Sequence, residues 1–478
     1  MSQGFHAYEF DPALIARYGA AERHADCSTA LPFHADFDEA ALRAAIRDSN
    51  EEPIPRPLSV QVSVPFCLTP CFYCDSGCER LTADATEADR YLERLYREIG
   101  LIAPLFDRDR SVRELQFGGG TSNFLDIARM RELMESLARH FSFSHEASRD
   151  YGIEIDPRFA DAAYVRALGE LGFNRVSVGV HDFDPQVQQA IGRIQSLERT
   201  REVIEAARTA HFRSIGVDLI YGMPKQGLDR LSHTLAHVVA LAPDRITVCG
   251  YAHVPQMFTP QRQVDVADLP DSATRLALLG HVLEQLSGAG YVYLGMNQFV
   301  RVDDELAVAQ RAGRLRCNFR DYSTQGECDT VGLGLGAISR VGDCYSQNAR
   351  DLIGYYAALD AGRLPVARGL MVGEDDLIRR ELVGTLMCRG ELDKQAFGRR
   401  HQLLFDKYFA RERQRLRPLL ADGLVQEDAC RLRVTARGRL LLHAIARCFD
   451  AHAREVAHIP STPRPRRSDP CNIDPRTR

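Results

Sequence analysis

The chain has 478 residues, of which 45% are hydrophobic and 26% are charged, and its formal net charge is −5. These values are typical of a soluble globular protein with a sizeable core, and the acidic balance argues against a nucleic-acid-binding protein. No stretch of about 18 apolar residues is present, so no membrane span is expected, and the acidic first residues argue against a secretory signal. We therefore expect a cytoplasmic protein that binds no nucleic acid and has no membrane span.

Residues 1–55 predict an irregular N-terminal arm with short helices, one of them over the segment DFDEAALRAAIRDS. This segment has an acidic start and apolar residues at helical spacing. Three prolines, Pro53, Pro55 and Pro57, then break regular structure and end the arm.

Strand and helix patterns alternate over residues 56–350. The expected strands are short apolar runs bounded by turn residues, a pattern typical of buried parallel strands. They cover residues 59–64, 114–118, 152–155, 175–180, 215–222 and 245–251. Helical stretches lie between them, such as the one in which Leu92, Leu95, Ile99 and Ile102 recur at helical spacing. This alternation predicts an α/β domain on a parallel sheet, either open or curved into a full or partial barrel, with its chemistry at the carboxyl ends of the strands.

Residues 351–458 indicate a mostly helical C-terminal domain. Within it, residues 416–449 predict a helix, a turn, two short strands and a helix, which resembles a winged-helix unit. The acidic charge of the chain favours a packing or substrate-covering role for this unit over nucleic-acid binding. Residues 459–478 are rich in proline and arginine, which predicts a disordered tail.

Four of the 13 cysteines crowd into the segment VPFCLTPCFYCDSGC, directly after the first expected strand. Cys67, Cys71 and Cys74 have C-x₃-C-x₂-C spacing. Four thiolates close every iron of a [4Fe–4S] cluster, so three leave one iron open for a small chelating molecule. The amino and carboxylate groups of S-adenosylmethionine can chelate that iron, and one electron passed to the sulfonium then yields a 5′-deoxyadenosyl radical. The alternative is a structural zinc site that adds Cys78, but zinc sites usually pair two C-x₂-C knuckles across a longer loop.

The cysteine spacing, with Tyr73 before the third cysteine, resembles the signature of the radical S-adenosylmethionine superfamily. The GGGT segment at 118–121 ends the second strand, and glycines there let the backbone approach a ligand closely. A tight turn is the plainer interpretation. The resemblance implies that Gly119, Gly120 and Thr121 lie at the methionyl amino group of the cofactor.

Three charged residues are further candidates for the cofactor site. Glu154 ends the third strand, where its carboxylate could accept hydrogen bonds from an ammonium or a ribose. Arg193 could pair with the methionyl carboxylate, because a guanidinium matches carboxylate geometry. Asp218 lies in an apolar strand, where a buried acid needs a partner. Taken one by one, Glu154 could equally be a solvated loop acid and Arg193 a surface residue.

A longer resemblance covers roughly residues 8–455. The segments EIDPR, GFNRVSVGV, VDLIYGMPKQ, DDELAVAQR and VTARGRLLL, in this order, look like the oxygen-independent coproporphyrinogen III oxidase family. The resemblance implies a curved partial (β/α)₆ barrel with an added, mostly helical C-terminal domain. It also implies oxidative decarboxylation of two propionates of coproporphyrinogen III to vinyl groups, which gives protoporphyrinogen IX in haem biosynthesis. Finally, it implies that Ala252 and Ile338 contact S-adenosylmethionine, that flavodoxin or ferredoxin donates electrons, and that the chain is a monomer.

Several positions depart from the family pattern. Gln61 and Ser63 stand where the family has an aromatic residue and a histidine, and Gln298 stands where it has a histidine. His181 and Arg320 replace glutamines; the imidazole of His181 could still contact the cofactor as a hydrogen-bond donor. These departures leave two alternatives open: a radical methyltransferase or other tailoring enzyme on the same scaffold, and a relative that binds haem as a chaperone.

The glycine run GLGLG at 332–336 resembles a dinucleotide-binding pattern. No acidic residue follows at the distance that such a site needs to bind a ribose. We therefore expect a flexible turn near the cofactor pocket.

Overall fold

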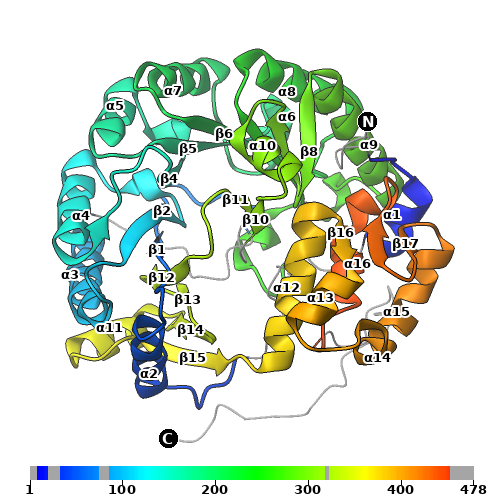
Figure 1. Ribbon diagram of the computed structural model, residues 1–478. Coiled ribbons are helices and arrows are strands. Elements are labelled where there is room, and N and C mark those ends of the chain that lie inside the picture. Colours follow the sequence, from blue (N-terminus) through cyan, green and yellow to red (C-terminus); the bar gives the residue numbers. More distant parts are fainter. Residues whose placement is uncertain (1–7, 20–32, 75–84, 318–321, 453–478) are drawn as a thin grey trace, which may run out of the picture.

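The computed structural model describes residues 8–19, 33–74, 85–317 and 322–452. Its main feature is a 13-stranded sheet in the order β15-β14-β13-β12-β1-β2-β4-β5-β6-β7-β9-β8, with β3 paired to β2. The sheet curves into a partial barrel that is not closed (Figure 1). The predicted fold class is confirmed.

The centre of the sheet is a run of parallel strands. These are β12 (Asp329–Leu333), β1 (Leu58–Val64), β2 (Ser111–Gly119), β4 (Asp150–Ile155), β5 (Arg175–His181), β6 (Ser214–Tyr221) and β7 (Arg245–Gly250). All six strands expected from the sequence are present among them, and β12 is an addition. Parallel pairing brings the carboxyl ends of these strands to one edge of the sheet.

Antiparallel strands extend the sheet on both sides. They are β13 (Ile338–Val341), β14 (Cys344–Asn348) and β15 (Val366–Met371) beyond β12, and β9 (Gln298–Arg301) and β8 (Tyr291–Gly295) beyond β7; the short β3 (Ser142–Phe143) pairs with β2. The sequence analysis did not predict these strands. Because β15 pairs with β14, the sheet extends to Met371, past the expected domain boundary at residue 350.

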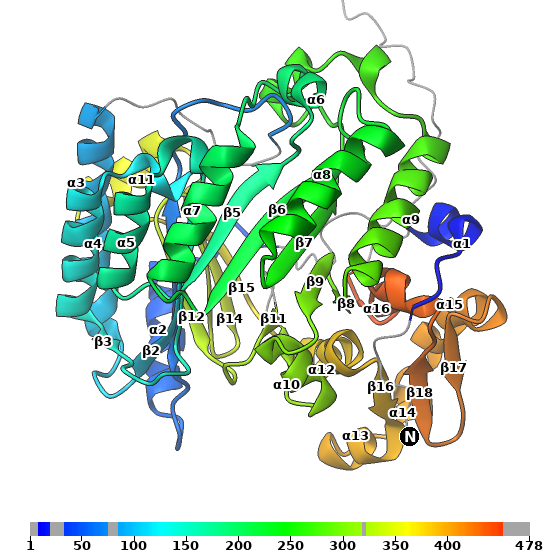
Figure 2. The same cartoon turned by 90° about the horizontal axis from the view of Figure 1, so that it is seen from above.

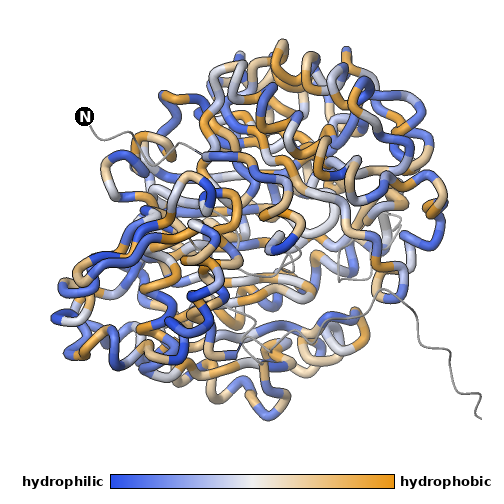
Figure 3. The backbone as a smooth tube through the Cα atoms, turned by 90° about the vertical axis from the view of Figure 1, so that its right-hand side faces the viewer, coloured by the Kyte–Doolittle hydropathy of each residue, from blue (hydrophilic) through white to orange (hydrophobic). Residues whose placement is uncertain are grey.

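Helices cover the outer face of the sheet (Figures 1 and 2). They are α3 (Ala85–Ile102), α4 (Ile127–His140), α5 (Ala162–Glu170), α6 (Pro185–Ala190), α7 (Leu197–Thr209), α8 (Leu228–Leu241), α9 (Ser272–Gly288) and α11 (Leu352–Asp360), with α2 (Glu39–Asn50) preceding β1. Several begin at a side-chain cap: Asp126, Asp161 and Ser196 each accept a hydrogen bond from a backbone N–H in the first turn. Such caps satisfy donors that a helix start leaves unpaired. Hydrophilic and hydrophobic stretches are interspersed along the chain, as Figure 3 shows.

The two faces of the sheet differ in chemistry. Along a strand, successive side chains point to opposite faces. Val60, Ile153 and Val217 point to the helix-covered face and are buried in the core. Their neighbours Glu154 and Asp218 therefore lie on the other face, which lines the inside of the partial barrel and is called the inner face below.

A second hydrophobic core lies in the C-terminal region. It is built from α12 (Glu374–Arg389), α13 (Lys394–Arg400), α14 (Phe405–Tyr408), α15 (Ala410–Ala421), α16 (Leu442–Arg447) and the sheet β16 (Glu391–Asp393), β18 (Arg431–Val434), β17 (Val425–Glu427). The expected pattern of helix, two strands and helix is present, and β16 adds a third strand. The N-terminal helix α1 (Pro12–Tyr18) packs on this core, where Arg17 pairs with Asp422 at 2.8 Å.

The remaining elements are short. They are α10 (Glu305–Arg311), β10 (Arg316–Cys317), β11 (Tyr322–Ser323) and the 3₁₀ helices η1 (Ala103–Leu105), η2 (Ser122–Phe124), η3 (Pro157–Phe159), η4 (Thr259–Gln263), η5 (Val266–Asp268) and η6 (Gly438–Leu441). Within the described segments, no helix has the length and apolarity that a membrane span needs. The predicted tail at 459–478 lies outside the described residues.

Candidate cofactor site

The cysteine segment follows β1 at the carboxyl edge of the parallel strands. Cys67, Cys71 and Cys74 are buried, with 3%, 5% and 4% of their surface exposed. The segment is held to the rest of the edge by backbone hydrogen bonds, including Phe72 N–H to the carbonyl of Ile191 at 2.9 Å. Three thiols that are close in sequence are therefore fixed and shielded from water.

The end of β2 packs directly against this segment. The N–H of Gly120 donates to the carbonyl of Val64 at 2.6 Å, and the N–H of Thr121 donates to that of Phe66 at 2.8 Å. A side chain at Gly120 would place its Cβ 2.4 Å from the Phe66 carbonyl oxygen, and Gly119 has a φ of +108°. Glycine is therefore required at both positions.

Two guanidinium groups approach the second cysteine. Arg193 donates to Cys71 Sγ at 3.7 Å and Arg158 donates to the same sulfur at 3.8 Å. Both arginines also bind the buried carboxylate of Asp156, at 2.8 and 2.7 Å. Burial raises the pKa of Asp156, but the hydrogen bonds from Arg158 and the charge of Arg193 outweigh it, so the pKa lies below its ordinary value.

Arg193 is thus already engaged by protein groups. Its Nη2 also donates to the carbonyl of Gly179 at 2.6 Å, and its buried Nε has no hydrogen-bond partner in the part of the chain that the structure describes. The sequence analysis did not single out Arg158, although it directly follows the Asp156-Pro157 pair at the end of β4. A lone arginine gives no pattern that points to a sulfur 87 positions away.

Three predicted residues lie on the inner face, on neighbouring strands. Glu154 of β4 is in register with Ser177 of β5, whose hydroxyl donates to Asp218 of β6 at 2.6 Å. His181 ends β5 with a φ of +66°, and its ring lies 5.2 Å from that of Tyr73 in the cysteine segment. The strand order thus brings two of the predicted carboxylates and the predicted imidazole to the same part of the sheet.

Ala252 follows β7 and is joined to the cysteine segment by one amide side chain. The Nε2 of the buried Gln261 donates to the carbonyls of Ala252 at 3.2 Å and of Tyr73 at 3.1 Å, while its Oε1 accepts from Val254 N–H at 2.6 Å. The sequence analysis missed Gln261, because this bridge exists only after residues 188 positions apart are brought together.

Ile338 begins β13, directly after the glycine run. The expected turn at 332–336 is present only in part, because residues 332–333 belong to β12 and the turn covers 334–336. Gly334 N–H donates to Glu98 at 2.8 Å and Leu335 N–H donates to the hydroxyl of Tyr91 at 3.0 Å. Both acceptors come from α3, so the helix fixes the run.

The departures from the family pattern fall in different places. Gln61 and Ser63 lie on the inner face of β1, directly before the cysteine segment, and Gln298 begins β9. Cys78 and Arg320 lie outside the described residues. Within the described segments, no group of three or more Cys, His, Asp or Glu side chains is arranged to hold one metal ion. A cubane cluster makes a different demand, because its thiolates bind separate irons.

The donor set fits such a cluster. Three buried thiols lie close in sequence, two guanidinium groups beside Cys71 offset negative charge, and Gly119 and Gly120 let the end of β2 approach the segment. The fold and this edge define a radical S-adenosylmethionine protein. In agreement, residues 62–238 match the Radical SAM superfamily and residues 372–441 match the HemN C-terminal domain.

Comparisons with known proteins identify the family more narrowly. The chain is 44% identical to the oxygen-independent coproporphyrinogen III oxidase of Pseudomonas aeruginosa, over 93% of this chain and 96% of the relative. It is 41% identical to that of Escherichia coli, over 94% and 97%. A solved structure of coproporphyrinogen III oxidase (HemN) from Escherichia coli, described as a radical SAM enzyme, superposes with a TM-score of 0.87 over 93% of this chain and 99% of that one. The chain belongs to the oxygen-independent coproporphyrinogen III oxidase family.

Proposed function

We propose that this chain converts coproporphyrinogen III to protoporphyrinogen IX by oxidative decarboxylation of two propionates to vinyl groups. The observation that carries the proposal is near-complete coverage of relatives with this activity, together with the buried three-cysteine segment in the same fold. In each of the two decarboxylations a hydrogen atom leaves the propionate β-carbon, carbon dioxide departs, and an external acceptor takes the remaining electron.

Cys67, Cys71 and Cys74 would hold a [4Fe–4S] cluster with one iron open to S-adenosylmethionine. When bound, this pair supplies the radical that abstracts the hydrogen atom. The chain itself shields the site from water and neutralises charge. Burial of the thiols and the arginines beside Cys71 support this assignment.

The remaining predicted residues would orient S-adenosylmethionine. Gly119, Gly120 and Thr121 present backbone beside the cysteine segment and suit the methionyl amino group. The other candidates are side chains or backbone at the ends of neighbouring strands: Glu154, His181, Arg193, Asp218, Ala252 and Ile338. Because Arg193 already binds Asp156, its role would be to offset the charge of Cys71 as much as to bind a carboxylate.

Partners and location follow from the same proposal. An electron donor such as flavodoxin or ferredoxin would reduce the cluster, and the enzyme would act as a cytoplasmic monomer. An alternative function on this scaffold is a radical methyltransferase or another tailoring enzyme. It is favoured by Gln61 and Ser63, which place amide and hydroxyl groups beside the cysteine segment where the family has an aromatic residue and a histidine.

The test is an anaerobic assay of the reconstituted protein with coproporphyrinogen III, S-adenosylmethionine and a reductant. We expect products with first one and then two vinyl groups, identified by mass after oxidation to porphyrins. A methylated product would favour the tailoring enzyme. Tight haem binding without turnover would favour the chaperone-like relative, and either result would overturn the proposal.

A further inference from the structure

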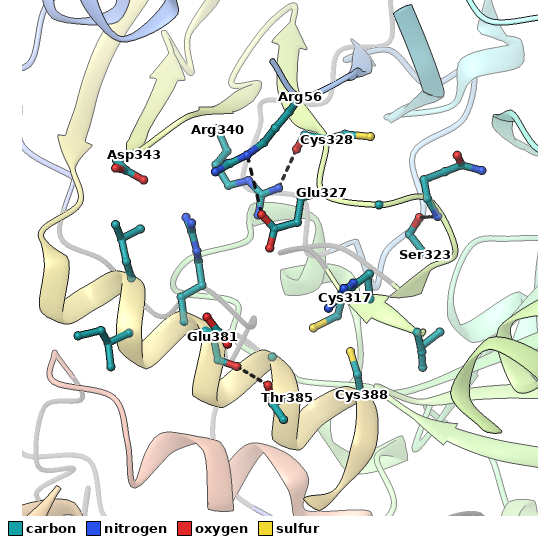
Figure 4. Close-up of a pocket in the computed structure, with 18 of the residues that line it drawn as sticks. Arg56, Cys317, Ser323, Glu327, Cys328, Arg340, Asp343, Glu381, Thr385 and Cys388 are labelled. Atoms are coloured by element: carbon teal, nitrogen blue, oxygen red, sulfur yellow. Dashed lines mark hydrogen bonds and ion pairs between the residues drawn. The ribbon is translucent and has the colours of Figure 1, made fainter. Parts of the chain in front are cut away.

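A large cavity lies where the inner face of the sheet meets the C-terminal domain. Its volume is about 940 Å³. One wall carries Arg56, Cys328 and Arg340 from the sheet region, and the other carries Glu381 and Thr385 from α12 (Figure 4). This volume suits a large organic ligand, since binding pockets usually span about 300 to 1,000 Å³.

The cavity continues the surface that carries the predicted cofactor residues. Ile338 and Arg340 are two positions apart on β13, and Val341 packs in the core on the opposite face. Alternation therefore places Ile338 and Arg340 on the inner face, about 7 Å apart along the strand. Arg340 is in register with Thr330 of β12, which pairs with Ser59 of β1, so the cavity lies toward the amino ends of the parallel strands. The carboxyl end of β1 is five residues further on, about 17 Å away along the strand, and a ligand must extend along the inner face to reach both.

Two arginines of the cavity keep buried donors that no acceptor of the described residues satisfies. Arg380 makes neither a hydrogen bond nor an ion pair with any part of the chain that the structure describes, and its Nη1 is buried. Arg340 donates from Nη2 to the carbonyl of Cys328 at 2.8 Å, but its buried Nε has no hydrogen-bond partner within the described segments. Buried guanidinium donors without acceptors are costly, so their retention points to an anionic ligand.

Most acidic groups of the cavity are occupied by the protein instead. Glu381 pairs with Arg400 at 2.5 Å, and Glu327 lies 3.9 Å from Arg56. Glu114 accepts a hydrogen bond from Ser323, and burial raises its pKa. Asp343 and Glu374 also line the cavity, but the arginines that make no ion pair within the described segments outnumber them: Arg316, Arg340, Arg380 and Arg389. The groups that remain available for a ligand are therefore mainly cationic.

We propose that this cavity binds the substrate's carboxylate side chains, with Arg380 and Arg340 as guanidinium contacts to propionates away from the reacting one. This inference rests on the proposed function, because coproporphyrinogen III carries four propionates that extend from different sides of its ring, so that one can face the cofactor while others reach toward the cavity. Arg380 is then a specificity-determining residue, since each guanidinium can bind one carboxylate through two hydrogen bonds.

The experiment compares the reconstituted holoenzyme with its R380Q and R380K variants in turnover of coproporphyrinogen III. We expect R380Q to raise KM by about tenfold or more, the loss of one charged hydrogen-bonded contact, with little change in kcat. R380K should be intermediate, because it keeps the charge and loses the paired geometry. Titration with coproporphyrin III, followed by absorbance, should show the same order of affinities.

The matched control is R399Q, an exposed arginine of α13 that does not line the cavity. It should bind and turn over like the wild type. R380Q should keep its iron content and should not melt earlier than the wild type, because it loses no protein contact. An unchanged KM and affinity in R380Q, or an equal rise in R399Q, would overturn the inference while vinyl formation by the wild type keeps the proposed function. If the wild type binds coproporphyrin III through Arg380 but forms no vinyl product, the proposed function fails and the inference about the cavity stands.

Discussion

Gly120 sets how closely the end of β2 approaches the cysteine segment. Its N–H donates to Val64, and an added Cβ would lie 2.4 and 2.8 Å from backbone atoms of Phe66. Backbone atoms cannot swing aside as the end of a flexible side chain can. Any side chain at this position must therefore move the segment that carries the three buried cysteines.

We expect Gly120→Ala to displace the cysteine segment, lower the iron bound after reconstitution to well under half, and destabilise the chain by about 1–3 kcal/mol. Iron and sulfide per chain, and the urea midpoint, measure these effects. Gly288→Ala is the control, because a Cβ there meets no heavy atom within 4 Å. Full iron content in Gly120→Ala would show that the close approach is not needed for cluster binding.

Helix α3 fixes three separate parts of the edge at once. Tyr91 donates to the carbonyl of Ser63, next to the cysteine segment, at 2.6 Å. Two turns further along α3, Glu98 accepts hydrogen bonds from Gly334, Asn348 and Tyr355. Burial raises the pKa of Glu98 to about 7, although these three donors lower it in part.

This raised pKa predicts a pH dependence of stability. Between pH 4.5, the ordinary pKa of the group, and about 7, the folded chain keeps a proton on Glu98 that the unfolded chain releases. The free energy of unfolding should therefore fall with rising pH in this window, by up to about 3 kcal/mol, and level off above it. Glu98→Gln cannot titrate, so relative to the wild type it should gain stability from pH 5 to pH 8.

Urea unfolding of both proteins at several pH values measures the difference. Glu135→Gln on α4 is the control, because Glu135 is exposed. Wild-type and Glu98→Gln curves that stay parallel across this pH range would show that Glu98 does not titrate there.

The same contacts explain which elements the sequence could predict. β6 was predictable because its apolar run is buried in a parallel sheet. β14 was not, because Ser346, Gln347 and Asn348 are polar and yet only 3%, 8% and 7% exposed. Their burial depends on distant partners such as Glu98, and strand preference of this kind is set by context.

The residues of the candidate site also differ in whether the sequence could predict them. The cysteine spacing and the glycines of GGGT are local patterns, so they were predictable from the sequence. The contacts of Arg158 and Gln261 with the cysteine segment were not, because they join residues 87 and 188 positions apart. Local pattern thus predicts the cofactor class, and folding supplies the groups that hold and neutralise the segment.

Two large hydrophobic cores of the described residues are joined by a smaller cluster that includes Leu306, Leu315 and Tyr322. Hydrogen bonds to backbone acceptors of α12 reinforce this junction: the hydroxyl of Tyr322 donates to Met387 at 3.1 Å, and Gln310 Nε2 donates to Cys388 at 3.4 Å. The cysteine segment belongs to the first part, and α12 brings the second part to the cavity. Damage to the second core should therefore affect substrate binding before cluster binding.

A substitution at Phe409 tests whether the C-terminal core affects substrate binding separately from cluster binding. It is fully buried, and its ring lies 4.9 Å from Phe405 and 5.7 Å from Phe449. We expect Phe409→Ala to cost about 3–5 kcal/mol and to loosen the C-terminal domain. Limited proteolysis should then cut after residue 372 earlier than in the wild type, and KM for coproporphyrinogen III should rise, while iron content is kept.

Leu404→Ala, with 74% of the side chain exposed, should behave like the wild type. Loss of iron in Phe409→Ala in step with the rise in KM would mean that the two cores fold as one unit, because separate cores can lose the cavity wall without releasing the cysteine segment.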